Sequence, residues 1–287
     1  MIAVWKHELS SHFHSLTAYI FSAFLLAFVG LGAMLYNIQS SVANFEYVLS
    51  FVCLGFVVII PILTMKVVAE ERRQKTDQLL YSLPITTSQI IIGKYLALLV
   101  VYLVPLVIIS FYPLIFARFG EVYLLTSYGS IFAFFMMGAA LIAIGTFISS
   151  LTDNLGFAAG IAIPVILLNY YSVTLAEYVS STAVGSAIAL IVAAVILGFV
   201  VRYVTRNDKL ALGTGAILSI AVAGFYVMDS SVFEGLLADI MKKLSLFERF
   251  YKFVNGVFDL TGIVYYVTVM VFFLFLSVQS LEKRRYN

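Results

Sequence analysis

The side chains that could do acid-base, nucleophilic or metal chemistry are few in this chain, and their spacing does not form a reactive site. The three histidines, His7, His12 and His14, crowd near the N-terminus without the carboxylates or thiols of a metal site. The one cysteine, Cys53, lies inside an apolar run, so it cannot form an intramolecular disulfide and reads as a small packing residue. A hydrolase dyad is also missing, and we predict a chain without catalytic, cofactor-binding or metal-binding residues of its own.

A nucleotide-binding loop is missing as well. The phosphate loop has the form GxxxxGK[ST], in which backbone amides surround the phosphates and the lysine reaches them. Here Gly93-Lys94 is followed by Tyr95, and Ser88 stands where the first glycine should be. If ATP drives this protein, a separate chain must bind the ATP and Mg²⁺.

Composition indicates that the lipid bilayer is the solvent of this chain. The 287 residues are 62% hydrophobic and 11% charged, whereas soluble domains average about 45–50% apolar and about 25% charged. The apolar residues occur in runs of about 20, the length that a helix needs to cross about 30 Å of hydrocarbon. We therefore predict an all-α integral membrane protein, a polytopic bundle of transmembrane helices. A net charge of +2, with basic residues at the ends of the apolar runs, does not favour nucleic-acid binding.

Uncharged apolar stretches predict a topology of about eight spans. Pro164 and Asn169 in the fifth stretch, and Gly213 and Gly215 in the seventh, could mark broken or re-entrant helices, so about six or seven spans stay open. The stretches are Thr17 to Tyr36, Tyr47 to Met65, Tyr95 to Phe116, Ser127 to Ser150, Gly156 to Thr174, Ala183 to Val201, Leu210 to Met228 and Leu260 to Leu281.

Lysine and arginine residues predict the orientation of the spans. They concentrate before the first span, between the second and third, between the sixth and seventh, and after the last. The positive-inside rule therefore places both termini in the cytoplasm of a multi-pass plasma membrane protein. A cleaved signal peptide is not favoured, because the first run begins only near Thr17, follows a single lysine, Lys6, and ends at bulky Tyr36.

The spans as drawn contain no Asp, Glu, Lys, Arg or His. An ionisable group inside a membrane costs about 2.5–3.5 kcal/mol on insertion scales and is retained for function, as in proton relays. Their absence argues against a proton-coupled carrier. It leaves a sodium-coupled carrier open, because such a carrier can use carbonyl and hydroxyl groups alone.

Two amphipathic segments lie at the predicted membrane surfaces. Residues 229–259 form an extracytoplasmic amphipathic loop with two helical stripes, from Phe233 to Leu244 and from Phe247 to Val257, which suit a lid or a plain interfacial connection. Residues 1–16 form an interfacial helix, which is an anchor or a moving part. Its apolar stripe consists of Ile2, Trp5, Leu9, Phe13 and Leu16.

Residues 66–94 form the largest predicted cytoplasmic connection. Its first half is a charged helix with Glu71 and Lys75 at i,i+4, which turns apolar just before Pro84 ends it. Thr86 and Gln89 then fit a capping box that begins the next helix. A solvated loop needs no large apolar residues, so we interpret this segment as a docking element for a cytoplasmic partner.

Three motifs are spread over nearly the whole chain. The first is made of Glu70-Glu71, Thr76, Leu79-Leu80, Ser82 to Thr86 and Ile91 to Ala97. The second is Ser149 to Asn154 after the fourth span, and the third runs from Leu246 through Asp259-Leu260 to the segment Leu281 to Arg285. In these motifs the chain resembles the ABC-2 type permeases, and within them the branch with gliding-motility and multicopper-enzyme-maturation permeases.

The resemblance implies one permease domain over residues 1–287 that pairs with a second permease, either a copy of itself or a sister chain. Two cytoplasmic ABC ATPases, which carry the ATP and Mg²⁺, would dock on the 66–94 segment, and their closure would drive a substrate outward. The coupling residues that the resemblance implies are Glu70, Glu71, Thr76, Leu79, Leu80, Ser82 and Pro84, with a second contact at Thr152, Asp153 and Asn154. Leu155 departs from the family pattern, in which a polar residue often follows the asparagine.

The same resemblance puts the first, second and fifth spans at the permease interface. Asn169, Tyr170 and Tyr171 thereby become candidate pathway residues. Hydrogen bonding between helices, worth about 0.6–2 kcal/mol, is the plainer interpretation of these side chains. The alternative functions are an ion-coupled secondary transporter or channel and a non-transporting membrane scaffold of a larger complex. The residues do not indicate a substrate.

Overall fold

The computed structural model describes residues 2–76, 85–179, 181–205 and 208–285, and all regular secondary structure in these ranges is helical. The chain divides into two compact units. One consists of Met1–Tyr170 and Arg249–Asn287, and the other of Tyr171–Glu248. Each unit is described by itself below.

Six helical segments of the described residues are long and apolar enough to cross a membrane, and two shorter apolar helices accompany them. Together these segments coincide with the apolar stretches predicted from the sequence, so the prediction of a polytopic helical membrane protein is confirmed. The long segments are Leu16–Gln39, Glu46–Gln74, Thr87–Phe116, Leu124–Leu151, Leu155–Tyr178 and Leu260–Arg284, and the shorter ones are Ala183–Phe199 and Leu212–Met228.

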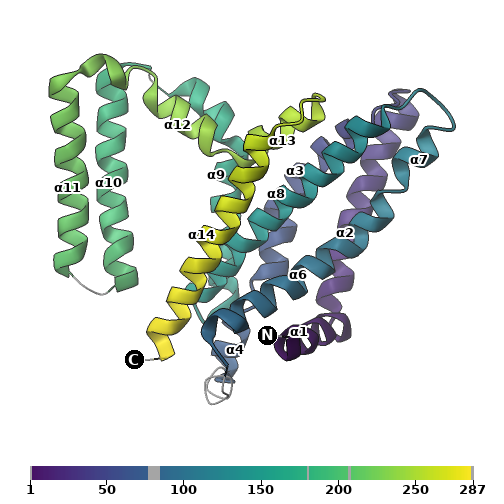
Figure 1. Ribbon diagram of the computed structural model, residues 1–287, viewed down its shortest axis with the longest axis horizontal. Coiled ribbons are helices and arrows are strands. Elements are labelled where there is room, and N and C mark those ends of the chain that lie inside the picture. Colours follow the sequence, from purple (N-terminus) through teal and green to yellow (C-terminus); the bar gives the residue numbers. More distant parts are fainter. Residues whose placement is uncertain (1, 77–84, 180, 206–207, 286–287) are drawn as a thin grey trace. The chain divides into compact units, whose positions relative to one another are not determined.

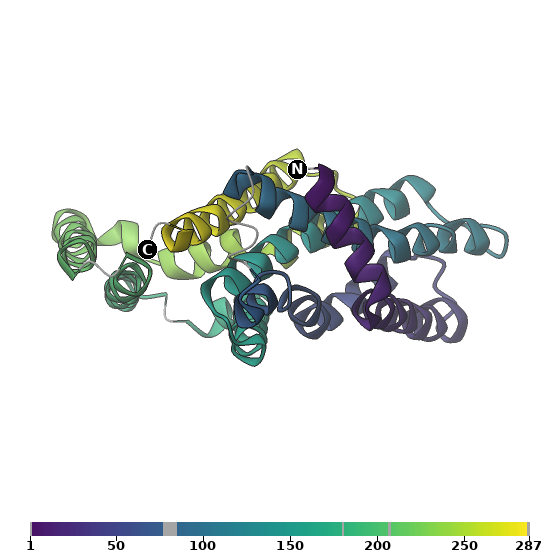
Figure 2. The ribbon, with the colours of Figure 1, turned by 90° about the horizontal axis from the view of Figure 1, so that it is seen from below.

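The first unit is a bundle built around α8 (Leu124–Leu151), which packs against α3 (Glu46–Thr64), α6 (Thr87–Ile109) and α14 (Leu260–Arg285) (Figure 1). Helix α1 lies across the ends of its neighbours α2 and α6 (Figure 1 and Figure 2). The remaining helices that lie wholly or partly in this unit are α1 (Ile2–His14), α2 (Leu16–Gly32), the π-helix η1 (Ala33–Gln39), α4 (Ala69–Gln74), α7 (Tyr112–Phe116), α9 (Leu155–Tyr178) and α13 (Leu246–Val254).

Glycines let α8 come close to its neighbours. A Cβ atom at Gly138 would overlap the ring of Tyr102 on α6, and one at Gly145 would overlap the side chain of Thr64 on α3. The Tyr102 hydroxyl donates a hydrogen bond to the carbonyl oxygen of Phe134 at 2.8 Å, one turn before Gly138. In a bilayer, where lipid tails are as apolar as leucine, such close packing and interhelical hydrogen bonding hold helices together.

The second unit contains a helical hairpin. Helices α10 (Ala183–Thr205) and α11 (Asp208–Met228) pack along each other. A 3₁₀ turn (Ser230–Phe233) and α12 (Leu236–Leu244) follow, and the Gly235 amide donates to the Ser181 carbonyl at 3.0 Å. The hairpin and the short helices therefore form one packed unit.

Several helices extend past the predicted spans and include charged residues, and two of these residues, Glu46 and Lys94, are buried. Helix α3 begins at Glu46, which is buried and accepts a hydrogen bond from the Ser127 hydroxyl at 3.2 Å. Helix α6 begins at Thr87 and therefore includes Lys94, which is also buried. The span limits were drawn at the nearest charge, whereas the helices continue past it, so buried charged groups lie directly at the ends of two predicted spans.

Other local predictions need correction. Helix α9 continues through Pro164, and α11 continues through Gly213 and Gly215. The fifth and seventh spans are therefore not broken. In the 229–259 loop, Gly235 has a φ of 69°, a conformation that glycine adopts without strain, and it divides the first predicted stripe between a 3₁₀ turn and α12.

The Gly138 contact makes a testable prediction about stability. Changing Gly138→Val should lower the free energy of unfolding by about 1–3 kcal/mol, because the added methyl groups overlap the buried ring of Tyr102. The thermal unfolding midpoint of the purified protein in detergent measures the change. Gly129→Val is the matched control on the same helix, since a Cβ there meets nothing within 4 Å. Equal midpoints for the two variants would show that α6 and α8 do not depend on this contact.

Candidate functional site

A buried ion-pair cluster joins three helices at the end of the first unit where α1 and α4 lie (Figure 1). The Nζ atom of Lys94 on α6 is 2.8 Å from Oε1 of Glu8 on α1 and 2.6 Å from Oε1 of Glu71 on α4. The Lys94 side chain is 2% exposed, and those of Glu8 and Glu71 are 14% and 23% exposed. We call these three residues the Lys94 junction. It connects segments that are far apart in the sequence through charge-assisted hydrogen bonds.

The start of α6 positions Lys94. The Thr86 side chain accepts a hydrogen bond from the Gln89 amide at 3.3 Å, so the predicted cap is confirmed and the helix begins here. Two turns later, Gly93 allows α1 to approach, because a Cβ atom at Gly93 would be 3.1 Å from Cγ1 of Val4 and 3.4 Å from the Trp5 amide nitrogen. Lys94, the next residue, then reaches Glu8, one helical turn after Val4.

Helix α4 presents Glu71 toward α6. It has only six residues, and Lys75 ends it in the left-handed conformation with a φ of 58°. The amide and hydroxyl groups of Thr76 both donate to the Glu71 carbonyl, at 3.0 and 3.3 Å. Because Lys75 adopts this conformation and the Glu71 carboxylate binds Lys94, the predicted helical pair of Glu71 and Lys75 is wrong.

Ser149 on α8 holds the other end of α4. Its hydroxyl oxygen accepts hydrogen bonds from the amides of Val68 and Ala69, both at 3.2 Å, and the hydroxyl donates to the Met65 carbonyl at 3.0 Å. These groups lie between the end of α3 and the start of α4, where helix termini leave backbone groups without helical partners. The serine therefore fixes the turn between α3 and α4 to the central helix of the bundle.

The C-terminal half of α14 reaches the same end of the unit. The Thr87 hydroxyl at the start of α6 donates to Oε1 of Glu282 at 3.1 Å, and the Ser280 hydroxyl donates to the Ser150 carbonyl at 2.9 Å. Helices α1, α4, α6, α8 and α14 are thus all connected here by polar contacts or by the Lys94 junction. A displacement of α4 can therefore be transmitted to each of these helices through this chain of contacts.

His12 lies on the face of α1 that carries Glu8. Burial lowers the pKa of His12, an effect that Lys94 and Lys66 reinforce and that Glu8 and Glu70 oppose. Its Nε2 atom is buried and has no hydrogen-bond partner among the residues that the structure describes. Burial therefore favours the neutral form of His12 at pH 7, and the ion pairs of the junction are those of Lys94 with Glu8 and Glu71.

The predicted coupling residues have different places in the structure. Glu71 belongs to the Lys94 junction and Thr76 caps α4 beside it, whereas Glu70 accepts a hydrogen bond from Gln74 at 3.5 Å on the same helix. Leu79, Leu80, Ser82 and Pro84 lie outside the described residues.

The second predicted contact forms a turn between α8 and α9. The Asn154 amide donates to the Thr152 hydroxyl at 3.1 Å, and Asn154 Oδ1 accepts from the Gly156 amide at 2.9 Å. Asp153 lies exposed in the same turn. Asn154 thus caps the start of α9, and Leu155 does not disturb this hydrogen bonding.

The candidate pathway residues do not belong to the Lys94 junction. Asn169, Tyr170 and Tyr171 are in the C-terminal half of α9, a helix that contributes no residue to the junction. Asn169 and Tyr170 are half-buried, and Tyr171 is exposed. The structure therefore leaves both interpretations of these residues, pathway and interhelical hydrogen bonding, as predictions.

Sequence reasoning did not assign Glu8, Lys94 or Ser149 to the site, although Lys94 and Ser149 lie inside the motifs that carry the family resemblance. One signal was present: Glu8 is the only acidic residue in residues 1–16 and lies on a helix with an apolar face. Lys94 was counted as a basic residue at the edge of a span. Nothing in the local pattern of either residue indicates that they pair across 86 positions.

The charge balance of the junction predicts an asymmetric response to mutation. Lys94→Met should destabilise the protein by about 3–5 kcal/mol, because it leaves two carboxylates close together without a cation. Glu8→Gln or Glu71→Gln leaves one intact ion pair and should cost much less. Thermal midpoints in detergent test this order, with Lys6→Met on the exposed face of α1 as the control for loss of a lysine. A smaller effect for Lys94→Met than for either glutamine variant would contradict the electrostatic account.

The lowered pKa of His12 predicts a dependence of stability on pH. In the unfolded chain a histidine binds a proton below about pH 6.5, whereas the folded protein resists that proton, so stability should fall as the pH drops below 6.5. The thermal midpoint of the wild type should therefore decrease more between pH 7.5 and pH 5.5 than that of His12→Gln. Parallel changes in the two proteins would assign the pH dependence to other groups.

Comparison with known families identifies the chain. A family model described as ABC-2 family transporter protein matches residues 32–176, slightly more than half of the 287 residues. The match includes Glu71, Lys94 and Ser149 of the site, while Glu8 lies before it. A search of curated proteins gave no match. From the matched region and the helical membrane fold, we conclude that the chain belongs to the ABC-2 family of transporter proteins.

Proposed function

We propose that this protein is the permease subunit of an ATP-driven exporter, in which a separate ABC ATPase docks on residues 66–94 and moves the membrane helices through α4. The ion pair of Glu71 with Lys94 at 2.6 Å is the observation that supports the proposal most directly. It connects the segment predicted to meet the ATPase with α6 and, through Glu8, with α1.

The size of α4 explains why these contacts matter for coupling. A helix of six residues is too short to be stable alone. It is held by Ser149 at its start and by Lys94 through Glu71, so it moves together with the helices that carry those residues. A force on the 66–94 segment is thereby passed to α3, α6, α8 and α1. Such a movement shifts the transporter between two states if the ATPase has different contacts with each of them.

The arrangement of termini and charges supports a cytoplasmic position of the junction. Helix α1, helix α4 and the C-terminal part of α14 share one end of the first unit. The basic residues of this end include Lys66, Arg73 and Lys283, in agreement with the positive-inside rule. We propose that the protein lies in the plasma membrane with both termini in the cytoplasm, where ATP is available to the partner.

Two further parts of the proposal concern partners and the substrate path. The permease pairs with a second copy or a sister permease, and each permease meets one ATPase that holds ATP and Mg²⁺. The turn of Thr152, Asp153 and Asn154 is a second contact for the ATPase, supported by its exposure next to Ser149 and Ser150. Asn169, Tyr170 and Tyr171 on α9 are the candidate residues of the substrate path.

Recovery of the partner tests the proposal. The tagged chain is extracted from its native membranes in detergent, and co-purifying proteins are identified by mass spectrometry. The wild type should recover an ABC ATPase, and a Leu79→Asp, Leu80→Asp variant should lose it, because two carboxylates would replace apolar docking residues. The matched control is Val232→Asp, which changes an exposed apolar residue outside the 66–94 segment and should retain the ATPase.

A further variant separates docking from coupling. Glu71→Gln should still recover the ATPase, because the Glu71 carboxylate binds Lys94 within this chain. The same complex should transport less substrate per ATP hydrolysed, or show weaker coupling between substrate and ATPase activity. Failure of the wild type to recover any ABC ATPase while it stays folded would contradict the proposal. Transport driven by an ion gradient without ATP would favour a secondary carrier instead.

A further inference from the structure

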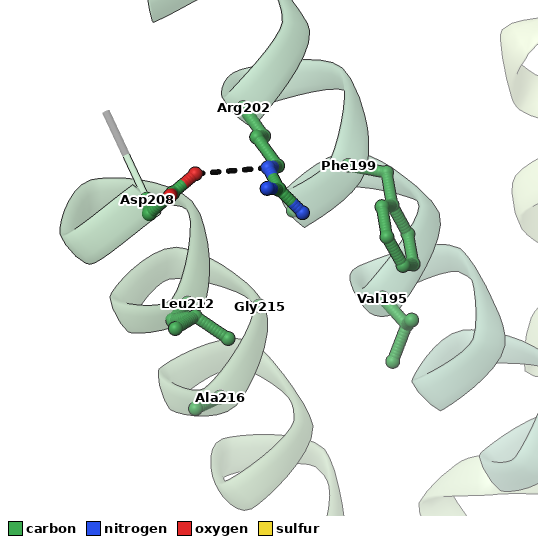
Figure 3. A pocket seen from close by; sticks show the side chains of 8 residues that line it. Val195, Phe199, Arg202, Asp208, Leu212, Gly215 and Ala216 are labelled. Atoms are coloured by element: carbon green, nitrogen blue, oxygen red, sulfur yellow. Dashed lines mark ion pairs between the residues drawn. The ribbon is translucent and has the colours of Figure 1, made fainter. Parts of the chain in front are cut away.

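The second unit contains an open groove between α10 and α11 that the transport proposal does not use. Its volume is about 370 Å³, within the range of about 300–1,000 Å³ that small-molecule sites occupy. Figure 3 shows the side chains of Val195 and Phe199 on α10 and of Leu212 and Ala216 on α11 along its sides. The groove is therefore mainly apolar along its length.

Two glycines are among the residues that line the groove. Gly198 and Gly215 lie opposite each other, since a Cβ atom at Gly215 would be 3.6 Å from the Cα atom of Gly198. Without side chains at these positions the two helices approach closely, and the larger side chains of Phe199 and Leu212 stand beside the contact. The side chains that line the groove here are aliphatic or aromatic, which suits a hydrocarbon chain.

An exposed ion pair lies at one end of the groove (Figure 3). The Nε atom of Arg202 is 2.8 Å from Oδ1 of Asp208, and the side chains are 60% and 68% exposed. An ion pair as exposed as this contributes only about 0–1 kcal/mol to stability, so it is not needed to hold the hairpin together. The ion pair uses Nε of Arg202 and Oδ1 of Asp208. The Nη nitrogens of Arg202 can therefore donate to an anionic group of a ligand, and Oδ2 of Asp208 can accept from a cationic group of the same ligand.

We propose that this groove binds a zwitterionic phospholipid whose headgroup ends in a primary ammonium group, such as phosphatidylethanolamine. The lipid phosphate binds Arg202, the ammonium group donates hydrogen bonds to Asp208, and one acyl chain lies along the groove. From Arg202 to Val195 the groove extends along about 10 Å of helix, which matches a chain that enters from the headgroup layer.

The charges at the mouth distinguish this lipid from other membrane lipids. Phosphatidylglycerol offers a phosphate to Arg202 but no cation to Asp208, so the carboxylate would face a second anion. Phosphatidylcholine carries a cation without N–H donors and cannot form charge-assisted hydrogen bonds with the carboxylate. The site is independent of the proposed ATP coupling and would exist in a carrier or scaffold as well.

Native mass spectrometry of the purified protein tests the assignment. The protein is delipidated in detergent, mixed with equal amounts of phosphatidylethanolamine and phosphatidylglycerol, and the bound lipids are counted. The wild type should bind about five times more phosphatidylethanolamine than phosphatidylglycerol, because one exposed ion pair changes an affinity by up to about fivefold. Asp208→Asn should abolish that preference, and Arg202→Gln should reduce the binding of both lipids.

A groove-filling variant tests the acyl-chain part of the proposal. Ala216→Phe places a ring in the groove and should remove the bound lipid, whereas Ala223→Phe, about two turns further along α11, should not. Equal binding of the two lipids by the wild type, or an unchanged preference in Asp208→Asn, would overturn the proposal. If Ala216→Phe fails to fold, Asp208→Asn still decides, because it changes only an exposed side chain.

Discussion

The buried ammonium group of Lys94 is the constraint on which the end of the first unit with α1 and α4 depends. A charge in such a position is strongly unfavourable without a partner, and here the two carboxylates come from two different helices, α1 and α4, that both precede α6 in the sequence. Helix α1 must therefore lie against α6, and α4 must turn back toward it. The close approach at Gly93 makes the first of these contacts sterically feasible. The short helix after α3 is thus a fixed part of the bundle.

The central helix α8 provides the framework for this arrangement. Its backbone at Gly138 lies against the side chain of Tyr102, and its backbone at Gly145 lies against the side chain of Thr64. At Ser149 it holds the turn that leads into α4 by hydrogen bonds. These contacts lie along one helix, so the junction is attached to the packed core of the membrane domain. The proposed coupling through α4 needs such an attachment, because a loose loop would not transmit a force to the membrane helices.

The sequence was sufficient to predict where the helices lie along the chain. It was not sufficient to predict which residues of different helices pair with each other. Apolar runs of span length and the cap at Thr86 are local patterns, and the structure has helices where they predict them. The pairing of Glu8 with Lys94 is not local, since a charged residue at the edge of an apolar run looks the same whether it faces water or a carboxylate. Glu46 was excluded from its span for the same reason, although it is buried against Ser127.

The hydrophobic periodicity of the sequence also could not predict backbone conformations outside regular helices. Lys75 adopts positive φ although it is not glycine, and this ends α4 before the predicted pair with Glu71 can form. The family resemblance did indicate the 66–94 segment as important, but it did not indicate which residues inside the protein the segment contacts. Those contacts depend on the packing of α1, α4 and α6 in three dimensions.

The distance between α1 and α4 tests the central claim, that the Lys94 junction makes these helices one rigid unit. Spin labels at His7→Cys and Arg73→Cys, both on exposed positions, in a Cys53→Ala background report this distance by pulsed electron paramagnetic resonance. The account predicts a narrow distance distribution in the labelled protein and a broad one when Lys94→Met is added. Distributions of the same width in both proteins would contradict it.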